Sequence, residues 1–192
     1  MIEEQKIKEV QDRIKQYISE GIVISKQKVD HVNFFLKNAD DSLQSARCLF
    51  DISTKHDYPG YDDLTGFLWV INASYYSMFY TTRALFESSG IKLKTNLSIH
   101  ALTFDVLVYF FYITGKLQKH LLGFYAAAKE DAADLLSQQR AGEIIEEYFY
   151  EKKKRAMFTY EIGEYAMENK AKTSLQRAIK FNKEIKRMIS HS

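Results

Sequence analysis

Apolar residues recur at spacings of three and four along nearly the whole chain, as they do on one face of a helix. Between residues 25 and 54, for example, Val32, Phe35, Leu36 and Ala39 share such a face. Only one proline and eight glycines occur in 192 residues, and these two residue types break or weaken helices. The pattern predicts a protein that is nearly all helical, and strand-like alternation is hard to find.

Breaks in this periodicity divide the chain into six or seven helices. The segment KHDYPGYDD holds the only proline and is the clearest predicted loop. Gly90 is placed to end the helix before the second loop, IKLKTNLS. The expected helices cover about residues 3–20, 25 or 28–54, 63–89, 97–114, 118–137, 141–168 and 171–189.

The expected fold class is all-α, an up-and-down helical bundle of four main helices with an additional short helix and an N-terminal helical arm. Residues 1–24 are expected to form the arm and residues 25–192 the bundle, because the later helices have apolar faces enough for a core of their own. No apolar run approaches the length needed to span a bilayer. The N-terminus is amphipathic and charged, without the apolar core of a signal peptide.

Composition limits the chemistry. The formal net charge is only +2, so any contact with RNA needs a local patch, and binding to DNA is not expected. Cys48 is the single cysteine, which excludes a disulfide within the chain and fits a reducing cytoplasm. The five histidines lack the spacing of metal ligands, and no glycine-rich phosphate loop occurs. No metal site and no other cofactor is expected.

The stretch INASYYSMFYTTRALF, residues 71–86, places five aromatic residues around one arginine, with no acidic residue before Glu87. Aromatic residues at helical spacing most often pack in a core. Arg83 needs a partner if it is buried, and that partner is either a structural carboxylate or a phosphate. One partly polar face of this helix is predicted to consist of Asn72, Tyr76, Phe79 or Tyr80, and Arg83.

The pattern N-A-x-Y-Y-x-M-F-x-x-x-R-A-L-F, followed by a loop and then by SIHALTF, resembles the HEPN superfamily (higher eukaryotes and prokaryotes nucleotide-binding). The small stand-alone prokaryotic branch is the most similar. FLKNADDSLQSARCLF resembles its first bundle helix, and KKKRAMFTYEIGEYA resembles its R-x-x-x-x-Y segment. The resemblance covers residues 30 to 189 and implies a homodimeric bundle of four main helices with a groove between long helices, often at the dimer interface.

Members of this superfamily act as metal-independent endoribonucleases, as toxins or antitoxins beside a minimal nucleotidyltransferase, or as nucleotide binders. The ribonucleases carry R-x(4–6)-H late in the bundle. In this chain Arg155 is followed by Tyr160 at the histidine position, and no other arginine has a histidine at that spacing. Since tyrosine titrates near 10, it is a poor general acid or base at neutral pH. The departure favours binding over cleavage.

The leading hypothesis from the resemblance is a homodimeric module that binds a nucleotide or an RNA phosphate and works beside a nucleotidyltransferase in a toxin–antitoxin-like system. Arg83 and Arg155 would supply charge, whereas Tyr76, His100 and Tyr160 would supply stacking and hydrogen bonds. Asn72 belongs to the same expected groove wall. The basic run KKKR at residues 152–155, with aromatic residues on both sides, either holds a phosphate or is a solvated face.

Two alternatives stay open. One is a metal-independent endoribonuclease with a divergent site, whose candidate catalytic residues are Arg155, His100 and Tyr160. The other is a non-catalytic antitoxin or scaffold, in which Arg83 and Arg155 would pair with carboxylates such as Glu130 or Asp134 and leave no open pocket.

Overall fold

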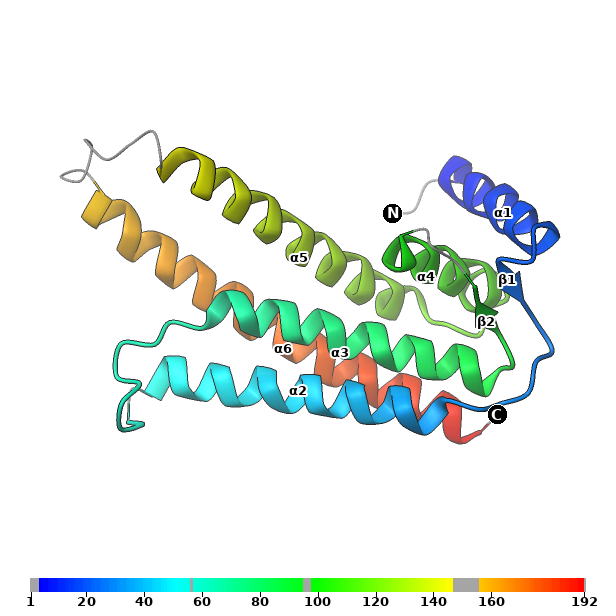
Figure 1. The fold of residues 1–192 in the computed structure, drawn as a ribbon, viewed down its shortest axis with the longest axis horizontal. Helices are drawn as coiled ribbons and strands as arrows, with labels where there is room; N and C mark the ends of the chain where they lie inside the picture. The colour runs from blue at the N-terminus through cyan, green and yellow to red at the C-terminus, as the bar shows by residue number, and fades with distance from the viewer. Residues whose placement is uncertain (1–3, 56, 95–97, 147–155, 192) are drawn as a thin grey trace.

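The computed structural model describes residues 4–55, 57–94, 98–146 and 156–191, and most of them are helical, as predicted (Figure 1). Within these ranges the helices pack against one another, and a π-helical turn, η1, directly continues the fourth of them. The elements are α1 (Glu4–Ser19), α2 (Val32–Lys55), α3 (Phe67–Ser88), α4 (Ile99–Leu107), η1 (Val108–Tyr112), α5 (Lys119–Glu146) and α6 (Ala156–Ser190).

A short antiparallel pair of strands, β1 (Val23–Ile24) and β2 (Lys92–Leu93), is the part that the prediction of an all-helical chain missed. Each strand has two residues, which is too short to leave an alternating pattern in the sequence. The pair joins the connection between α1 and α2 to the connection between α3 and α4. The second helix begins at Val32 and not at residue 25 or 28.

Gly90 ends α3 as predicted, and the fold requires a glycine at this position. Its φ is +68°, in the left-handed region that favours glycine. A Cβ at this position would lie 2.9 Å from the carbonyl oxygen of Gln27. The backbone N–H of Gln27 also donates a hydrogen bond to the carbonyl of Gly90 over 2.9 Å. The glycine therefore lets two connecting segments approach at their backbones.

The later helix boundaries differ from the predicted ones. α5 does not end near residue 137 but continues to Glu146, and it tolerates Gly142 in its interior. The predicted break between residues 168 and 171 is wrong, because α6 runs unbroken to Ser190. No glycine or proline occurs between Glu164 and Ser190, so nothing in the backbone ends the helix there.

α3 is the central helix, with α2 and α6 packed along it (Figure 1). The hydroxyl of Ser77 donates to the carbonyl oxygen of Ala39 on α2 over 2.7 Å. The Nδ2 of Asn182 on α6 donates to the same hydroxyl over 2.5 Å. All three residues are buried, so one serine side chain joins three helices at a single level of the core.

α1 packs on α4 and η1 through apolar contacts and one ion pair. Val10 and Ile14 are buried in the larger apolar cluster of the protein. Nε of Arg13 lies 3.0 Å from one carboxylate oxygen of Asp105 and Nη2 lies 3.2 Å from the other. That residues 1–24 form a unit of their own stays a prediction. Of the helices in the described part of the chain, none is both long and apolar enough to cross a membrane.

We expect Ser77→Ala to lower the free energy of unfolding by about 1–3 kcal/mol, because it leaves the buried amide of Asn182 without its acceptor. Chemical denaturation followed by circular dichroism measures this. Ser45→Ala is the matched control: its exposed hydroxyl bonds only to the Asp41 carbonyl of its own helix, so the expected change is within about 0.5 kcal/mol. Equal losses in the two variants would contradict the central role of Ser77.

Candidate functional site

His100 lies in the first turn of α4 and faces a group of aromatic side chains on α3. Its ring centroid is 4.6 Å from that of Phe79 and 5.7 Å from that of Tyr76. Its Nδ1 lies 2.8 Å from the hydroxyl oxygen of Tyr75, at hydrogen-bond distance. The structure therefore brings together two of the residues named from the sequence, His100 and Tyr76, and adds Tyr75 as the residue that holds the imidazole.

The aromatic contacts continue from Tyr76 along α3 towards Arg83. The ring centroids of Tyr76 and Tyr80 are 6.2 Å apart, and those of Tyr80 and Phe35, on α2, are 6.5 Å apart with planes inclined by 28°. The guanidinium carbon of Arg83 lies 5.0 Å from the centroid of Phe35, a cation–π distance. We call this series His100, Tyr76, Tyr80, Phe35 and Arg83 the aromatic row.

Beside the aromatic row lies a shallow groove of about 470 Å³ between α2 and α3, the α2–α3 groove. Trp69 and Tyr76 line it with 59% and 41% of their surface exposed. Rings that are exposed to this extent are open to contact by another molecule. The lining residues are Asn38, Asp41, Ser42, Ser45 and Leu49 of α2 and Trp69, Ala73, Tyr76 and Tyr80 of α3.

Arg83 has no ion pair with any carboxylate among the described residues, and its Nε is buried without a hydrogen-bond partner there. Burial lowers the pKa of Arg83, and the charge of Glu87, one turn further along α3, opposes that shift. Arginine nevertheless stays protonated in proteins. The buried carboxylate of Glu87 therefore acts on Arg83 electrostatically without forming an ion pair with it in the described part of the chain, and a phosphate remains a suitable direct partner.

Of the other predicted site residues, the structure describes the side chain of Asn72 alone, and Asn72 does not line this groove. Asn72 is 8% exposed, and its Nδ2 donates to the carbonyl of Leu68 in its own helix over 3.1 Å. Arg155, with the rest of the KKKR run, lies outside the described residues. Tyr160 falls within α6, but its side chain is not among those described.

His100 and Tyr75 form an uncharged pair at neutral pH. Burial lowers the pKa of His100, and the positive charge of Lys129 on α5 lowers it further. Burial also raises the pKa of Tyr75 to about 12. A neutral imidazole offers one donor and one acceptor, and Nδ1 is engaged with Tyr75, which leaves Nε2 for another group.

One acidic residue of α5, Asp131, forms ion pairs with basic residues of α6. Asp131 pairs with Lys170 over 3.0 Å and with Arg177 over 3.2 Å. Across the described ranges, no three histidine, cysteine or acidic side chains are grouped so that they could hold a metal ion.

Sequence reasoning missed several members of the site. Tyr80 stood as one of two possibilities, and the structure places it in the aromatic row while Phe79 is buried with 6% of its surface exposed. Trp69 precedes Tyr76 by seven residues, the spacing of one helix face, so periodicity could have indicated it. Phe35 and Lys129 come from other helices, and no local pattern in the sequence points to them.

Comparison with known proteins adds no assignment. A scan of protein-family models found no match for this chain, and searches of curated proteins and of solved structures found no significant match.

We expect His100 to titrate below its ordinary value of about 6.5 when followed by NMR, because burial disfavours the charged imidazole. Lys129→Ala should raise the midpoint but keep it below 6.5, since the burial remains. Lys183→Ala, an exposed lysine of α6, is the control that should leave it unchanged.

The same shift predicts how stability depends on pH. The unfolded chain binds more protons at His100 than the folded chain does between the two pKa values, so the free energy of unfolding should rise with pH up to about 6.5. His100→Gln should flatten this part of the profile. A midpoint at or above 6.5 would contradict the described environment of His100.

Proposed function

We propose that the chain is a HEPN-type module that binds a nucleotide or an RNA phosphate in the α2–α3 groove. One observation carries the proposal: the aromatic row connects His100, through the exposed ring of Tyr76, to Arg83, an arginine without a described carboxylate partner. Rings with open faces stack on bases, and a guanidinium binds phosphate oxygens in pairs. The aromatic row places a ring that can stack on a base and a guanidinium that can bind a phosphate along one edge of α3.

The proposal includes the architecture that the resemblance implies. In it α2, α3, α5 and α6 are the four main helices of an up-and-down bundle, α4 is the additional short helix and α1 is an N-terminal arm. The helix that carries N-A-x-Y-Y-x-M-F is α3, so the resemblance and the exposed aromatic residues both favour the same helix as the groove wall.

The chemistry of the groove suits a single-stranded or mononucleotide ligand. Tyr76 and Trp69 present stacking surfaces for bases, which every base can use. Asp41 lies in the groove lining, but Lys37 pairs with its carboxylate over 2.7 Å and offsets its charge. With a net charge of only +2 on the whole chain, the affinity should come mainly from stacking and from Arg83.

Partners belong to the same proposal. A homodimer and a minimal nucleotidyltransferase as partner, in a toxin–antitoxin-like system, follow from the sequence resemblance. The exposed rings of the groove support a surface that is covered in an assembly or by a ligand. Cys48, the only cysteine, is exposed, which suits a reducing cytoplasm.

A divergent metal-independent endoribonuclease is the second candidate, and the state of His100 favours it. A neutral imidazole, held by Tyr75 at Nδ1, has the form of a general base. Cleavage would also need Arg155 or Tyr160 within reach of the same phosphate. RNA incubated with the protein in excess chelator tests this: the binding proposal predicts no cleavage, whereas cleavage that is lost in both His100→Ala and Arg155→Ala would replace it with the ribonuclease.

The binding proposal has a built-in optical probe, since Trp69 is the only tryptophan and lines the groove. We expect AMP, ATP or a short single-stranded RNA to quench its fluorescence in a saturable way. Tyr76→Ala should weaken the affinity by about 5- to 150-fold, which corresponds to the loss of one stacked base. Tyr61→Ala, an exposed tyrosine outside the groove lining, should leave the affinity unchanged. Equal effects of the two substitutions, or no quenching by any of the three probes, would overturn the proposal.

Arg83 gives an independent test of the phosphate contact. Arg83→Gln should weaken binding of ATP about tenfold or more, since hydrogen bonds to charged groups contribute about 1.5–3 kcal/mol. It should also reduce the dependence of the affinity on salt. Arg47→Gln, at an exposed position of α2, should change neither quantity. Unaltered ATP affinity in Arg83→Gln would separate Arg83 from the site.

A further inference from the structure

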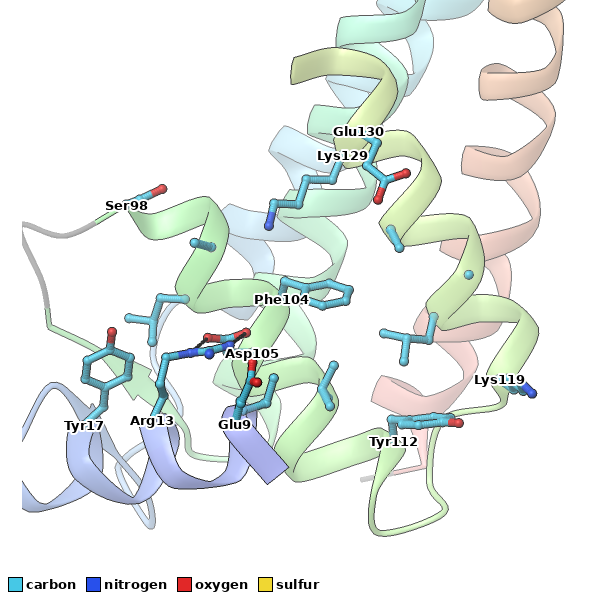
Figure 2. Close-up of a pocket in the computed structure, with 17 residues that line it drawn as sticks. Glu9, Arg13, Tyr17, Ser98, Phe104, Asp105, Tyr112, Lys119, Lys129 and Glu130 are labelled. Carbon is cyan, nitrogen blue, oxygen red and sulfur yellow. Dashed lines mark hydrogen bonds and ion pairs between the residues drawn. The ribbon is translucent and has the colours of Figure 1, made fainter. Parts of the chain in front are cut away.

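A second hollow, a cavity of about 890 Å³, lies between α1, α4 and α5 (Figure 2). It shares no lining residue with the α2–α3 groove. Close-packed protein interiors contain few voids larger than a water molecule, whereas pockets for small ligands measure about 300–1,000 Å³. The cavity therefore has the size of a ligand site and is not a packing defect.

Gly123 borders this space. It lies inside α5, lines the cavity, and no heavy atom lies within 4 Å of where its Cβ would be. Glycine weakens a helix interior relative to alanine, and nothing in the surrounding packing requires it here. Gly123 is exposed, so a larger side chain at this position would stand at the edge of the cavity.

The cavity wall is mainly apolar. Leu102, Phe104 and Val108 contribute from α4 and η1, and Leu122 contributes from α5. The ring of Phe104 reaches into the hollow between the two helices (Figure 2). Such a wall suits the apolar or aromatic body of a small molecule, since a few polar groups in a mainly apolar pocket are what fixes the orientation of a ligand.

Lys129 and Ser98 are the polar groups at one end of the cavity that could bind a ligand. The ammonium of Lys129 lies 5.1 Å from the ring centroid of Phe104, and no carboxylate in the described part of the chain forms an ion pair with it. Figure 2 shows Lys129 reaching over the hollow from α5, with Ser98 across from it at the start of α4 and the carboxylate of Glu130 turned to the other side. The side chain of Ser98 makes no capping hydrogen bond, so its hydroxyl is available to a ligand.

At the other end of the cavity one pair of opposite charges is neutralised, and Glu9 adds a negative charge. Arg13 and Asp105 are joined by two hydrogen bonds and neutralise one another. Glu9, on α1, also lines this end (Figure 2). Lys119 and Lys129 are the lining cations without an ion pair in the described part of the chain, and Lys129 is the one that lies over the ring of Phe104.

We propose that this cavity binds a small organic anion, with a planar apolar body against Phe104 and a single carboxylate, sulfonate or phosphate group at Lys129 and Ser98. α1 covers the bound molecule and is held in place by the ion pair of Arg13 with Asp105. The site is separate from the groove and does not depend on the function proposed for it.

The probe for this site is 8-anilinonaphthalene-1-sulfonate, which combines a planar apolar body with one anionic group and fluoresces in an apolar environment. We expect one saturable site on the 192-residue chain. Gly123→Leu should weaken binding by narrowing the cavity at its edge, and Lys129→Ala should weaken it about tenfold or more, as expected for the loss of a hydrogen bond to a charged group. Lys129→Arg should retain most of the affinity, and Lys183→Ala should leave it unchanged.

Two further measurements make the assignment specific. Circular dichroism shows whether Gly123→Leu still folds; if it does not, the comparison of Lys129→Ala with Lys129→Arg decides. The bound anion should also raise the pKa of His100 in an NMR titration, because it offsets the charge of Lys129 that lowers this pKa. Tyr76→Ala, in the groove, should leave the dye affinity unaltered.

Several outcomes would overturn the proposal. They are the absence of a fluorescence increase with the wild-type protein, an equal affinity in folded Gly123→Leu and wild type, and an equal loss in Lys129→Ala and Lys183→Ala. A loss of dye binding in Tyr76→Ala would place the dye in the groove and would overturn it as well. The first three results leave nucleotide binding measured through Trp69 untouched, so the two proposals can fail separately.

Discussion

The hydrogen bonds of the Ser77 hydroxyl are the interaction on which the rest of the structure depends. Ser77 is fully buried in α3, accepts from Asn182 of α6 and donates to the backbone of Ala39 in α2. Because a small side chain occupies this position, three helices approach closely at one level. Their relative positions then determine which side of α3 remains accessible, since α3 is buried along most of its other sides.

The polar and aromatic side chains that could bind a ligand lie along the accessible edge of α3. A helix that is buried almost all round normally carries apolar residues only, yet this one has tyrosines and an arginine along one edge, next to α2. The contact of Arg83 with the ring of Phe35 offsets part of the cost of holding a charge at a half-buried position. It leaves the hydrogen-bonding capacity of the guanidinium largely unused within the described chain, which is the feature that an anionic ligand would satisfy.

Much of the fold could be predicted from patterns among residues that are close in sequence. The candidate site could be predicted from such patterns only in part. The loop around Pro59, the cap at Gly90 and the helical periodicity of α3 could be predicted because each depends on residues close in sequence. The contact between α2 and α3 through Phe35, and the cavity under α1, depend on how helices pack, which periodicity does not fix. Asn72 shows the limit of prediction from helical spacing. The spacing places Asn72 on the same face as Tyr76, but its side-chain amide donates to the carbonyl of Leu68 in its own helix.

The most direct test of the central claim is an NMR search for contacts between a bound nucleotide and the aromatic side chains, with AMP in excess over the 192-residue chain. Intermolecular nuclear Overhauser effects should connect the base protons with the ring protons of Tyr76 and Trp69, the two exposed rings of the α2–α3 groove. Contacts confined to Phe104 and Tyr112 would place the nucleotide in the cavity beneath α1. Contacts to neither set would contradict nucleotide binding by either site.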